Sequence, residues 1–345
     1  MLKTIRLMLI LVLPLLAQTT SNPDFSIIGQ LMVESTEDET TVNGSDIELA
    51  VSGYVNPYAR AEVYLHKHDT ESAFELEEAV LTIERGLPFG LAARLGRLRP
   101  DFGKLNREHA HQWPFIKAPE GIASFAGGEL WSGTGAELSV LMPLPWYSQL
   151  SAGAFSNGMS TEAHDHDATH DVTVEEAGAY KSFSTRFGHF FELTPLMHLE
   201  LGTSCFFTPE TEATLVAIDT KVKWKPDTYR GLLLQSELIL NLHEDSDSEA
   251  DEEEEAHVEA PEMGLYAYAD YQFNRKWNIG IMLDGVKHHD EDLELTPAVF
   301  FGFSPVEESV VLRVLMKNEK HEYLSEPLVA TQLIWSLGPH KPHKF

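Results

Sequence analysis

The stretch Tyr58-Ala59-Arg60-Ala61-Glu62-Val63-Tyr64-Leu65 alternates small or apolar residues with more polar ones. Because successive side chains of a β-strand point to opposite faces, such a strand has one apolar face and one polar face. The same alternation returns in Leu265-Tyr266-Ala267-Tyr268-Ala269-Asp270-Tyr271-Gln272. It predicts an all-β chain whose sheet separates two different environments.

Working outward from this stretch, sixteen segments have the alternation of a strand. Their predicted centres lie near Ile28, Leu49, Val63, Val80, Ala93, Leu138, Ala152, Phe183, Leu199, Ile218, Ser236, Ala269, Ile281, Val299, Val314 and Gln332. Tight turns mostly follow the even-numbered segments, and longer polar stretches, such as Ser35 to Ser45, mostly follow the odd ones. The join from Gly188 to Pro195 is expected to be less tight than the other turns. This asymmetry and an even strand number are typical of a transmembrane antiparallel β-barrel with long external loops and short periplasmic turns.

The N-terminal 17 residues have the features of a secretory signal peptide. Lys3 and Arg6 are followed by the apolar run Leu7 to Leu16, and Ala17 precedes the expected cleavage point. The apolar run is shorter than the ~20 residues that a spanning helix needs. We therefore expect export of residues 18–345 and their insertion into the outer membrane of a Gram-negative bacterium, with its lipid as a partner.

The charge balance restricts the partners. With 54 Asp and Glu against 25 Lys and Arg, the formal net charge is -29. Nucleic acid is excluded as a partner because its phosphates require basic surfaces. An acidic surface attracts cations, so small ions or metal ions are the expected partners.

Charged residues on the polar strand faces are the candidate pore lining. They are Arg60, Glu62, Arg94, Arg97, Glu137, Asp219, Glu237, Asp270, Asp284 and Arg313. Unpaired charges are costly in hydrocarbon, so this face is expected to contact water. The charges favour an open channel over a plugged interior, and sixteen strands give a lumen wide enough to hold water.

Histidines collect in the segments predicted to be external. Those taken as candidate metal ligands are His66, His68, His109, His111, His164, His166, His170, His257, His288 and His289. Many have carboxylate neighbours, above all in the acidic loops 157–176 and 243–262. Imidazole and carboxylate are ligands of Zn²⁺ and similar ions. Because none of these segments has a fixed zinc-site spacing, we expect weak, exchangeable sites for Zn²⁺ or another divalent cation and no required cofactor; the alternative is solvated, solubilising loops.

The longest predicted loop, residues 99–133, begins in a basic and aromatic stretch of an otherwise acidic chain. A long ordered loop is usually functional. In one interpretation it folds into the lumen and sets a constriction. In the other it packs on the rim of the barrel, with Trp113 and Phe115 as anchors. The sequence leaves both interpretations open.

The run from Gly96 to His111, Gly-Arg-Leu-Arg-Pro-Asp-Phe-Gly-Lys-Leu-Asn-Arg-Glu-His-Ala-His, is followed by Trp113-Pro114-Phe115. It resembles a family of short barrels labelled zinc-regulated outer-membrane receptors or porins. The resemblance implies an outer-membrane location, a link to zinc supply, and a role for His109 and His111 as motif residues. The family label sometimes includes TonB dependence, but this chain is too short for the 22-stranded barrel of such receptors, so energy coupling is not carried over from the resemblance.

Together these features predict a porin that passes small solutes by diffusion and favours divalent metal cations such as zinc. One alternative is an anion porin of the phosphate type, and another is a non-conducting barrel that binds metal at the surface. An enzyme is not expected, since the sequence contains no Gly-x-Ser-x-Gly, His-Glu-x-x-His or phosphate-loop motif. Porins of this size are frequently trimers, so a homotrimer is expected by analogy of fold.

Overall fold

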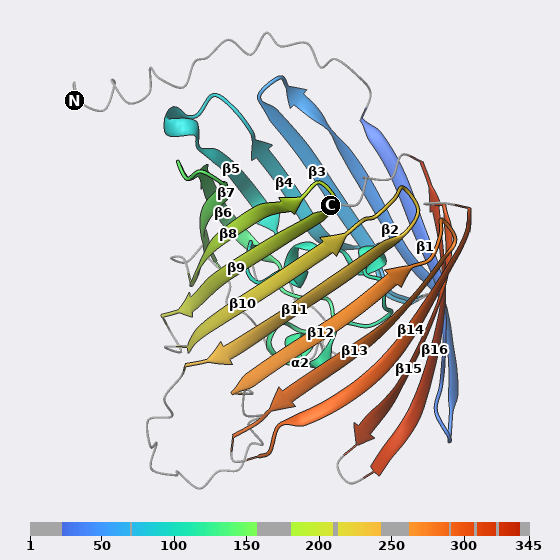
Figure 1. Ribbon diagram of the computed structural model, residues 1–345. Helices are drawn as coiled ribbons and strands as arrows, with labels where there is room; N and C mark the ends of the chain where they lie inside the picture. Colours follow the sequence, from blue (N-terminus) through green and yellow to red (C-terminus); the bar gives the residue numbers. More distant parts are fainter. Residues whose placement is uncertain are drawn as a thin grey trace, which may run out of the picture.

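The computed structural model describes residues 23–69, 71–156, 181–209, 213–242, 262–289, 291–306, 309–321 and 324–338. Within these residues sixteen antiparallel strands form one closed barrel, in which β1 pairs with both β2 and β16 (Figure 1). The strands are β1 (Asp24–Ser35), β2 (Thr40–Asn56), β3 (Ala59–Lys67), β4 (Glu75–Ile83), β5 (Ala92–Leu98), β6 (Gly133–Leu141), β7 (Tyr147–Phe155), β8 (Ser182–Thr194), β9 (Met197–Thr208), β10 (Ala213–Trp224), β11 (Gly231–Asn241), β12 (Met263–Gln272), β13 (Trp277–Lys287), β14 (Glu294–Val306), β15 (Val310–His321) and β16 (Leu324–Leu337). Each predicted strand centre falls inside one of these strands, so the predicted fold class is confirmed.

Two connections are shorter than the sequence analysis predicts. The expected loop from Ser35 to Ser45 is a four-residue turn, because β2 already begins at Thr40. The expected join from Gly188 to Pro195 is mostly strand, because β8 continues to Thr194. The first error comes from polar residues that belong to β2, since a polar side chain is compatible with strand pairing wherever it does not face lipid.

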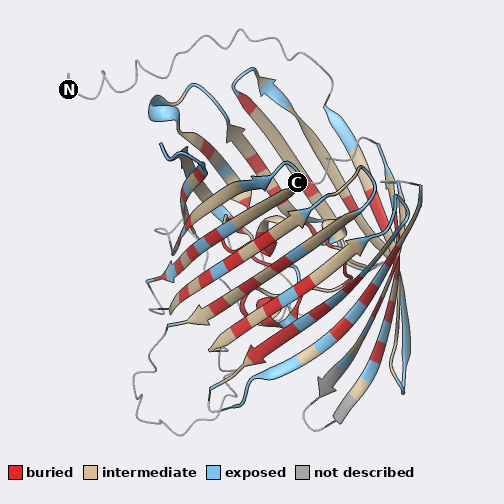
Figure 2. Ribbon diagram, viewed as in Figure 1, coloured by how far each residue is buried: buried red, intermediate tan, exposed pale blue. Residues whose placement is uncertain are grey.

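Burial alternates along the strands (Figure 2). On β16, Leu328 and Ala330 are buried, whereas Val329 and Trp335 are exposed on the outer wall. A belt of exposed aromatic residues lies beside the short turns and includes Trp146, Trp224, Trp277, Tyr54, Tyr58 and Tyr229. Such a belt is typical of the membrane interface. Closure satisfies the backbone groups of every strand, as an apolar solvent requires.

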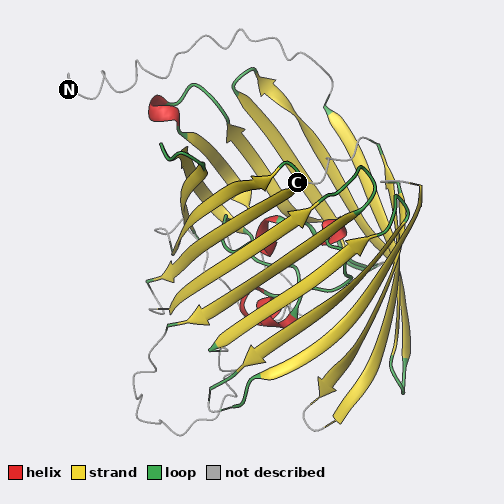
Figure 3. Cartoon of the chain, in the orientation of Figure 1, coloured by secondary structure: helices red, strands yellow, loops and turns green. Residues whose placement is uncertain are grey.

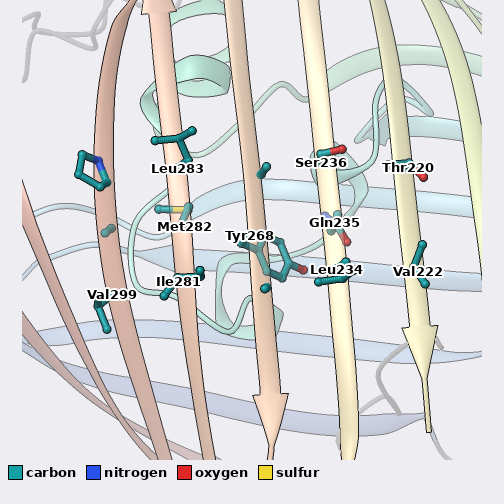
Figure 4. A pocket seen from close by; sticks show the side chains of 14 residues that line it. Thr220, Val222, Leu234, Gln235, Ser236, Tyr268, Ile281, Met282, Leu283 and Val299 are labelled. Atoms are coloured by element: carbon teal, nitrogen blue, oxygen red, sulfur yellow. The ribbon is translucent and has the colours of Figure 1, made fainter.

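The outer wall has a shallow apolar depression across β10 to β14 (Figure 4). Leu234, Ile281 and Val299 project along its sides, and the alanines Ala267 and Ala269 of β12 leave room between them. Its lining is mostly apolar, in keeping with a surface that faces acyl chains.

The segment between β5 and β6, here called the inserted loop (residues 99–132), lies inside the barrel (Figure 3). It contains two 3-10 turns, η2 (Leu105–Arg107) and η3 (Ala110–Gln112), and one short helix, α2 (Glu120–Ala126). A further 3-10 turn, η1 (Pro88–Gly90), lies between β4 and β5. Among the described residues no helix has the length and apolarity needed to cross a bilayer.

Candidate functional site in the barrel lumen

The inserted loop packs through its apolar side chains against one part of the inner wall. The Phe115 ring lies 5.3 Å from the Tyr268 ring and 6.0 Å from the Phe300 ring, measured between centroids. The Trp131 ring lies 4.2 Å from the Phe206 ring in an edge-on arrangement. All of these side chains are buried. This part of the wall, which we call the apolar wall, consists of Phe155 on β7, Phe206 on β9, Tyr266 and Tyr268 on β12, and Phe300 on β14.

The apolar wall bears on two expectations from the sequence, the contact of the inner face with water and the position of the long loop. The inner face does not meet water throughout, because here it forms a hydrophobic core with the loop. Trp113 and Phe115 are 1% and 0% exposed within that core, so they do not anchor the loop on the rim. The long loop therefore enters the lumen, which is the first of the two interpretations, and does not pack on the rim (Figure 3).

Polar groups of the wall hold the loop backbone. The Glu237 carboxylate accepts hydrogen bonds from the backbone N–H groups of Lys104 (3.0 Å) and Leu105 (3.2 Å). Arg313 donates to the carbonyl oxygen of His111 (2.8 Å). Glu137 acts in the same way, whereas Asp219 acts through Arg186. Arg186 is held by Asp219 and donates to the Gly103 carbonyl, and Glu137 accepts from the Asp101 N–H at 2.8 Å. Glu137, Asp219, Glu237 and Arg313 were predicted to line a pore, and in the structure they hold the loop, Asp219 by way of Arg186.

Helix α2 is held at its N-terminus by a carboxylate from the wall. Asp284 on β13 accepts hydrogen bonds from the N–H groups of Glu120 and Gly121, the latter at 2.9 Å. The first N–H groups of a helix have no partner within the helix, and a carboxylate is a favourable acceptor for them. The helix also lies against the sheet backbone. A Cβ on Gly264 would lie 1.7 Å from the Gly121 carbonyl oxygen, so this close approach requires a glycine.

A different group of side chains gathers where the loop meets β2 and β4. The Nε2 atom of His109 lies 3.1 Å from Glu78, and the Nδ1 atom of His111 lies 3.2 Å from Glu48. Glu77 contacts both Arg99 and His109. We call this group the charged seam, and its members are Glu48, Glu77, Glu78, Arg99, His109 and His111.

A β-bulge explains why two consecutive glutamates reach the same imidazole. Tyr64 of β3 pairs with Glu78 and Leu65 pairs with Leu76, so Glu77 is an extra residue in β4. A bulge changes the direction of side chains in the bulged strand. Glu77 and Glu78 therefore both face the loop, where regular alternation would place only one of them.

The seam is buried and carries unbalanced charge. Arg94 lies 3.0 Å from Glu137 and 3.7 Å from Glu78, and Arg99 contacts Glu77 and Glu78, so the three seam carboxylates together with Glu137 are opposed by two guanidinium groups. Two negative charges remain for the two imidazoles or for a cation to balance. Burial lowers the pKa of His109, but the Glu48 charge and the contacts with Glu77 and Glu78 outweigh it, so the pKa of His109 lies well above its ordinary value.

The seam also has buried polar atoms without hydrogen-bond partners among the described residues. They are the Nδ1 atom of His109, one oxygen of Glu48 and one oxygen of Glu77. One ligand atom each from Glu48, His109 and His111 lies within 4.8 Å of the others. This arrangement fits a divalent ion, because imidazole nitrogen and carboxylate oxygen are ligands of Zn²⁺ and similar metals.

A second histidine pair lies on the same wall, nearer the long-loop end. His66 Nε2 is 2.8 Å from Asp46, and His68 Nδ1 is 3.0 Å from Glu129 of the inserted loop. The hydrogen bond with Glu129 raises the pKa of His68 in spite of partial burial. Burial raises the pKa of Glu129, but His68 lowers it below its ordinary value through the same contact.

The remaining predicted site residues are not brought together. His164, His166, His170 and His257, the acidic segments 157–176 and 243–261, and the predicted signal peptide lie outside the described residues. His289 contacts Glu262 at 2.8 Å, and Glu262 also binds Lys287; neither His289 nor His288 belongs to a three-ligand group among the described residues.

The other predicted pore-lining residues lie as follows. Arg60 pairs with Glu62 at 3.0 Å, and Asp270 accepts a hydrogen bond from Asn278 at 2.7 Å. Arg97 is two residues from the exposed Leu95 on β5, so alternation places it on the outer face, opposite to the face of Arg94.

Several residues of the site were missing from the sequence analysis. Asp46, Glu77, Glu78 and Glu129 all contact histidines. The adjacent pair Glu77-Glu78 interrupts the alternation of β4, and this signal of a bulge is visible in the sequence. Glu129 has no such signal, because only the folded loop brings it to His68.

Comparisons with known proteins agree with the fold. No family model matches the chain. It is 26% identical over 332 residues to an uncharacterized protein of Aquifex aeolicus (strain VF5), covering 86% of this chain and 69% of that protein.

Solved structures of an outer membrane protein and of a porin are among those similar to this chain. OprB of Pseudomonas putida has a TM-score of 0.58 at 10% identity, with 92% of this chain and 94% of that chain covered. A loop-deletion mutant of OmpT, an outer membrane protein of Vibrio cholerae, has a TM-score of 0.56 at 8% identity, with 92% and 99% covered. A mutant of the Rh. blastica porin has a TM-score of 0.53 at 9% identity, with 91% and 100% covered.

At these identities the likeness concerns the fold alone. The closed sheet, the apolar outer wall and the aromatic belt agree with it. The chain therefore has the fold of a porin-like outer-membrane β-barrel.

Proposed function

We propose that the protein is a diffusion channel in which the inserted loop narrows the lumen and the charged seam favours divalent metal cations, with Zn²⁺ as the leading candidate. The observation that carries the proposal is the group formed by Glu48, His109 and His111, whose ligand atoms lie within 4.8 Å of one another. Two of these residues come from the loop and one from the wall. A bound ion would therefore sit where the loop meets the barrel.

The charge of the seam gives the direction of the selectivity. Two uncompensated negative charges attract a divalent cation and repel anions. Imidazole ligands add a preference for zinc-like ions over calcium or magnesium, which take oxygen ligands. Conduction also requires that binding be weak enough for release. A seam with three ligands from two separate chain segments is suited to such exchange.

The anion porin has less support. Arg94 and Arg99, two of the basic residues that would bind phosphate, are paired with Glu137 and Glu77. A guanidinium already committed to a carboxylate offers few donors to a passing anion. The non-conducting metal-binding barrel shares the same ligands, so it must be separated from the channel by experiment.

The assembly state remains part of the proposal. A trimer form of the Vibrio cholerae OmpT is among the similar structures. By that analogy we infer a homotrimer, and the mass of the purified protein in detergent, measured by light scattering, tests it.

The direct test of function is to record the current through the protein in planar lipid bilayers under a potassium chloride gradient and to measure its reversal potential. We expect discrete conductance steps and a reversal potential of the sign that indicates cation preference. Conductance steps with anion preference would contradict the cation channel and favour the phosphate-type porin. Absence of steps from a folded, zinc-binding protein would favour the non-conducting barrel.

A further inference from the structure

We propose that the barrel has a second, separate divalent-metal site, formed by Asp46 on β2, His66 on β3 and His68 just beyond β3, with Glu129 of the inserted loop as a fourth ligand. We call it the outer site and the Glu48–His109–His111 group the inner site. Metal binding at the outer site stands on its own geometry. That a passing ion binds the outer site before the inner site rests on the proposed function.

The ligand atoms of the outer site are already close together. One atom each from Asp46, His66 and His68 lies within 4.8 Å of the others. The two imidazole rings are 4.1 Å apart between centroids. Glu129 faces both rings, at 3.0 Å from His68 Nδ1 and 3.9 Å from His66 Nδ1. An ion among these atoms would replace the present contacts without a change of fold.

Regular strand pairing brings His66 to the same face as Asp46 and Glu48. Asp46 and Glu48 are two residues apart on β2, so their side chains leave the strand on the same face. His66 pairs with Glu48 in the register of β2 and β3. The outer and inner sites are therefore neighbours along one wall, with the outer site nearer the long-loop end.

The chemistry of the donor set indicates the class of ion. Two imidazoles and two carboxylates are a common set for Zn²⁺ and related transition metals, and their two negative charges neutralise a divalent cation. The site is partly open to solvent, since the side chains of His66, His68 and Glu129 are 15%, 24% and 54% exposed. Partial exposure allows an ion to enter from solvent and to leave again.

The inserted loop takes part in both sites. Glu129 lies near the end of the loop and reaches the outer site, whereas His109 and His111 lie in its first half and form the inner one. An ion at either position would link the loop to the wall formed by β2 to β4. The two sites are therefore successive binding sites, and an ion moves only a short distance between similar ligands.

Metal counting in the full-length protein tests the outer site. The protein, folded in detergent micelles without a histidine tag, is titrated with ZnCl₂ by calorimetry, and Co²⁺ is added in parallel as a visible-absorption probe of coordination. The variant H66Q/H68Q is compared with H189Q/H198Q, which removes two imidazoles from β8 and β9 near the short-turn end of the barrel. Heat-dependent migration in gels checks that each barrel is folded.

We expect H66Q/H68Q to bind one metal equivalent fewer than wild type, and H189Q/H198Q to bind the wild-type number. E129Q should keep the equivalent but bind it about tenfold more weakly, as is usual when a supporting ligand is lost. Equal stoichiometry and affinity in H66Q/H68Q and its control would overturn the outer site. If H66Q/H68Q does not fold, unchanged zinc affinity in E129Q overturns it instead.

Bilayer recordings on the same preparations separate the two proposals. A wild-type protein that loses one equivalent on H66Q/H68Q substitution but does not conduct keeps the outer site and overturns the channel. A cation-selective channel whose metal count is unchanged by H66Q/H68Q keeps the channel and overturns the outer site.

Discussion

The apolar wall and the charged seam hold the same loop by opposite means. At the apolar wall, Phe115 and Trp131 enter a hydrophobic core of aromatic rings, a contact that stabilises the loop by hydrophobic burial. At the charged seam, Glu48, Glu78 and His109 are buried and Glu77 and His111 are largely covered, which costs desolvation and contributes little net stability. The apolar wall therefore explains why the loop stays inside, and the seam requires a functional explanation.

The largest expected effect comes from removing the part of the loop that fills the apolar side. Replacing residues 113–127 by a short Gly-Ser linker removes Phe115 and helix α2 from the lumen. We expect a several-fold rise in single-channel conductance with cation preference retained, because Glu48, Glu77 and Glu78 belong to the wall. Single-channel recording measures both. Unchanged conductance would mean that the loop does not limit the pathway.

A single substitution in the apolar wall should release the loop without unfolding the barrel. Phe115→Ala removes a fully buried ring and should destabilise loop docking by about 3–5 kcal/mol. We expect faster proteolysis within residues 99–132, together with an unchanged melting temperature, because the strand ladder is untouched. Phe301→Ala, which removes a ring from the outer wall beside buried Phe300, is the matched control and should not affect proteolysis. Equal protection in both variants would contradict the assigned role of the apolar wall.

The corresponding change in the seam should affect selectivity and leave docking intact. Glu48→Gln keeps the shape of the side chain but removes one negative charge and one proposed ligand. We expect the reversal potential to shift towards zero and zinc affinity to fall by about tenfold or more. Glu192→Gln, at an exposed position near the end of β8, is the control. A wild-type reversal potential in Glu48→Gln would separate the seam from ion selection.

The smallest expected effect concerns the carboxylate at the start of α2. Asp284→Ala removes the acceptor of the Glu120 and Gly121 N–H groups and should destabilise the helix by about 1 kcal/mol. We expect faster hydrogen exchange at these two amides, with amides of the barrel strands unchanged. Exchange at the wild-type rate would show that α2 is held by packing against Gly264 alone.

The sequence was sufficient to predict the barrel and the alternation of inner and outer faces along its strands. Strand alternation depends on nearest neighbours only, so a stretch such as Ala59 to Leu65 carries it without reference to the rest of the chain. His109 and His111 were candidate metal ligands by residue type, but Glu48 was not among the candidate metal ligands. Their distances from Glu48 depend on the course of the loop, which no local pattern specifies.

The interior was predicted less well, for two physical reasons. Strands such as β9 and β14 carry adjacent aromatic residues, Phe206-Phe207 and Phe300-Phe301, of which one faces lipid and the other the loop. A run that is apolar on both faces gives no sign of which environment each face meets. Charges such as Glu237 were expected to need water, but the loop backbone supplies their hydrogen bonds instead.

The central claim is that ions pass along the charged seam, between the inserted loop and the wall. Its most direct test is a zinc titration of potassium current through single channels, in wild type and in His109→Gln/His111→Gln. The account predicts that zinc added on the long-loop side reduces the wild-type current reversibly, and that the double variant conducts with a much weaker response. Equal sensitivity of the two proteins to zinc would contradict it.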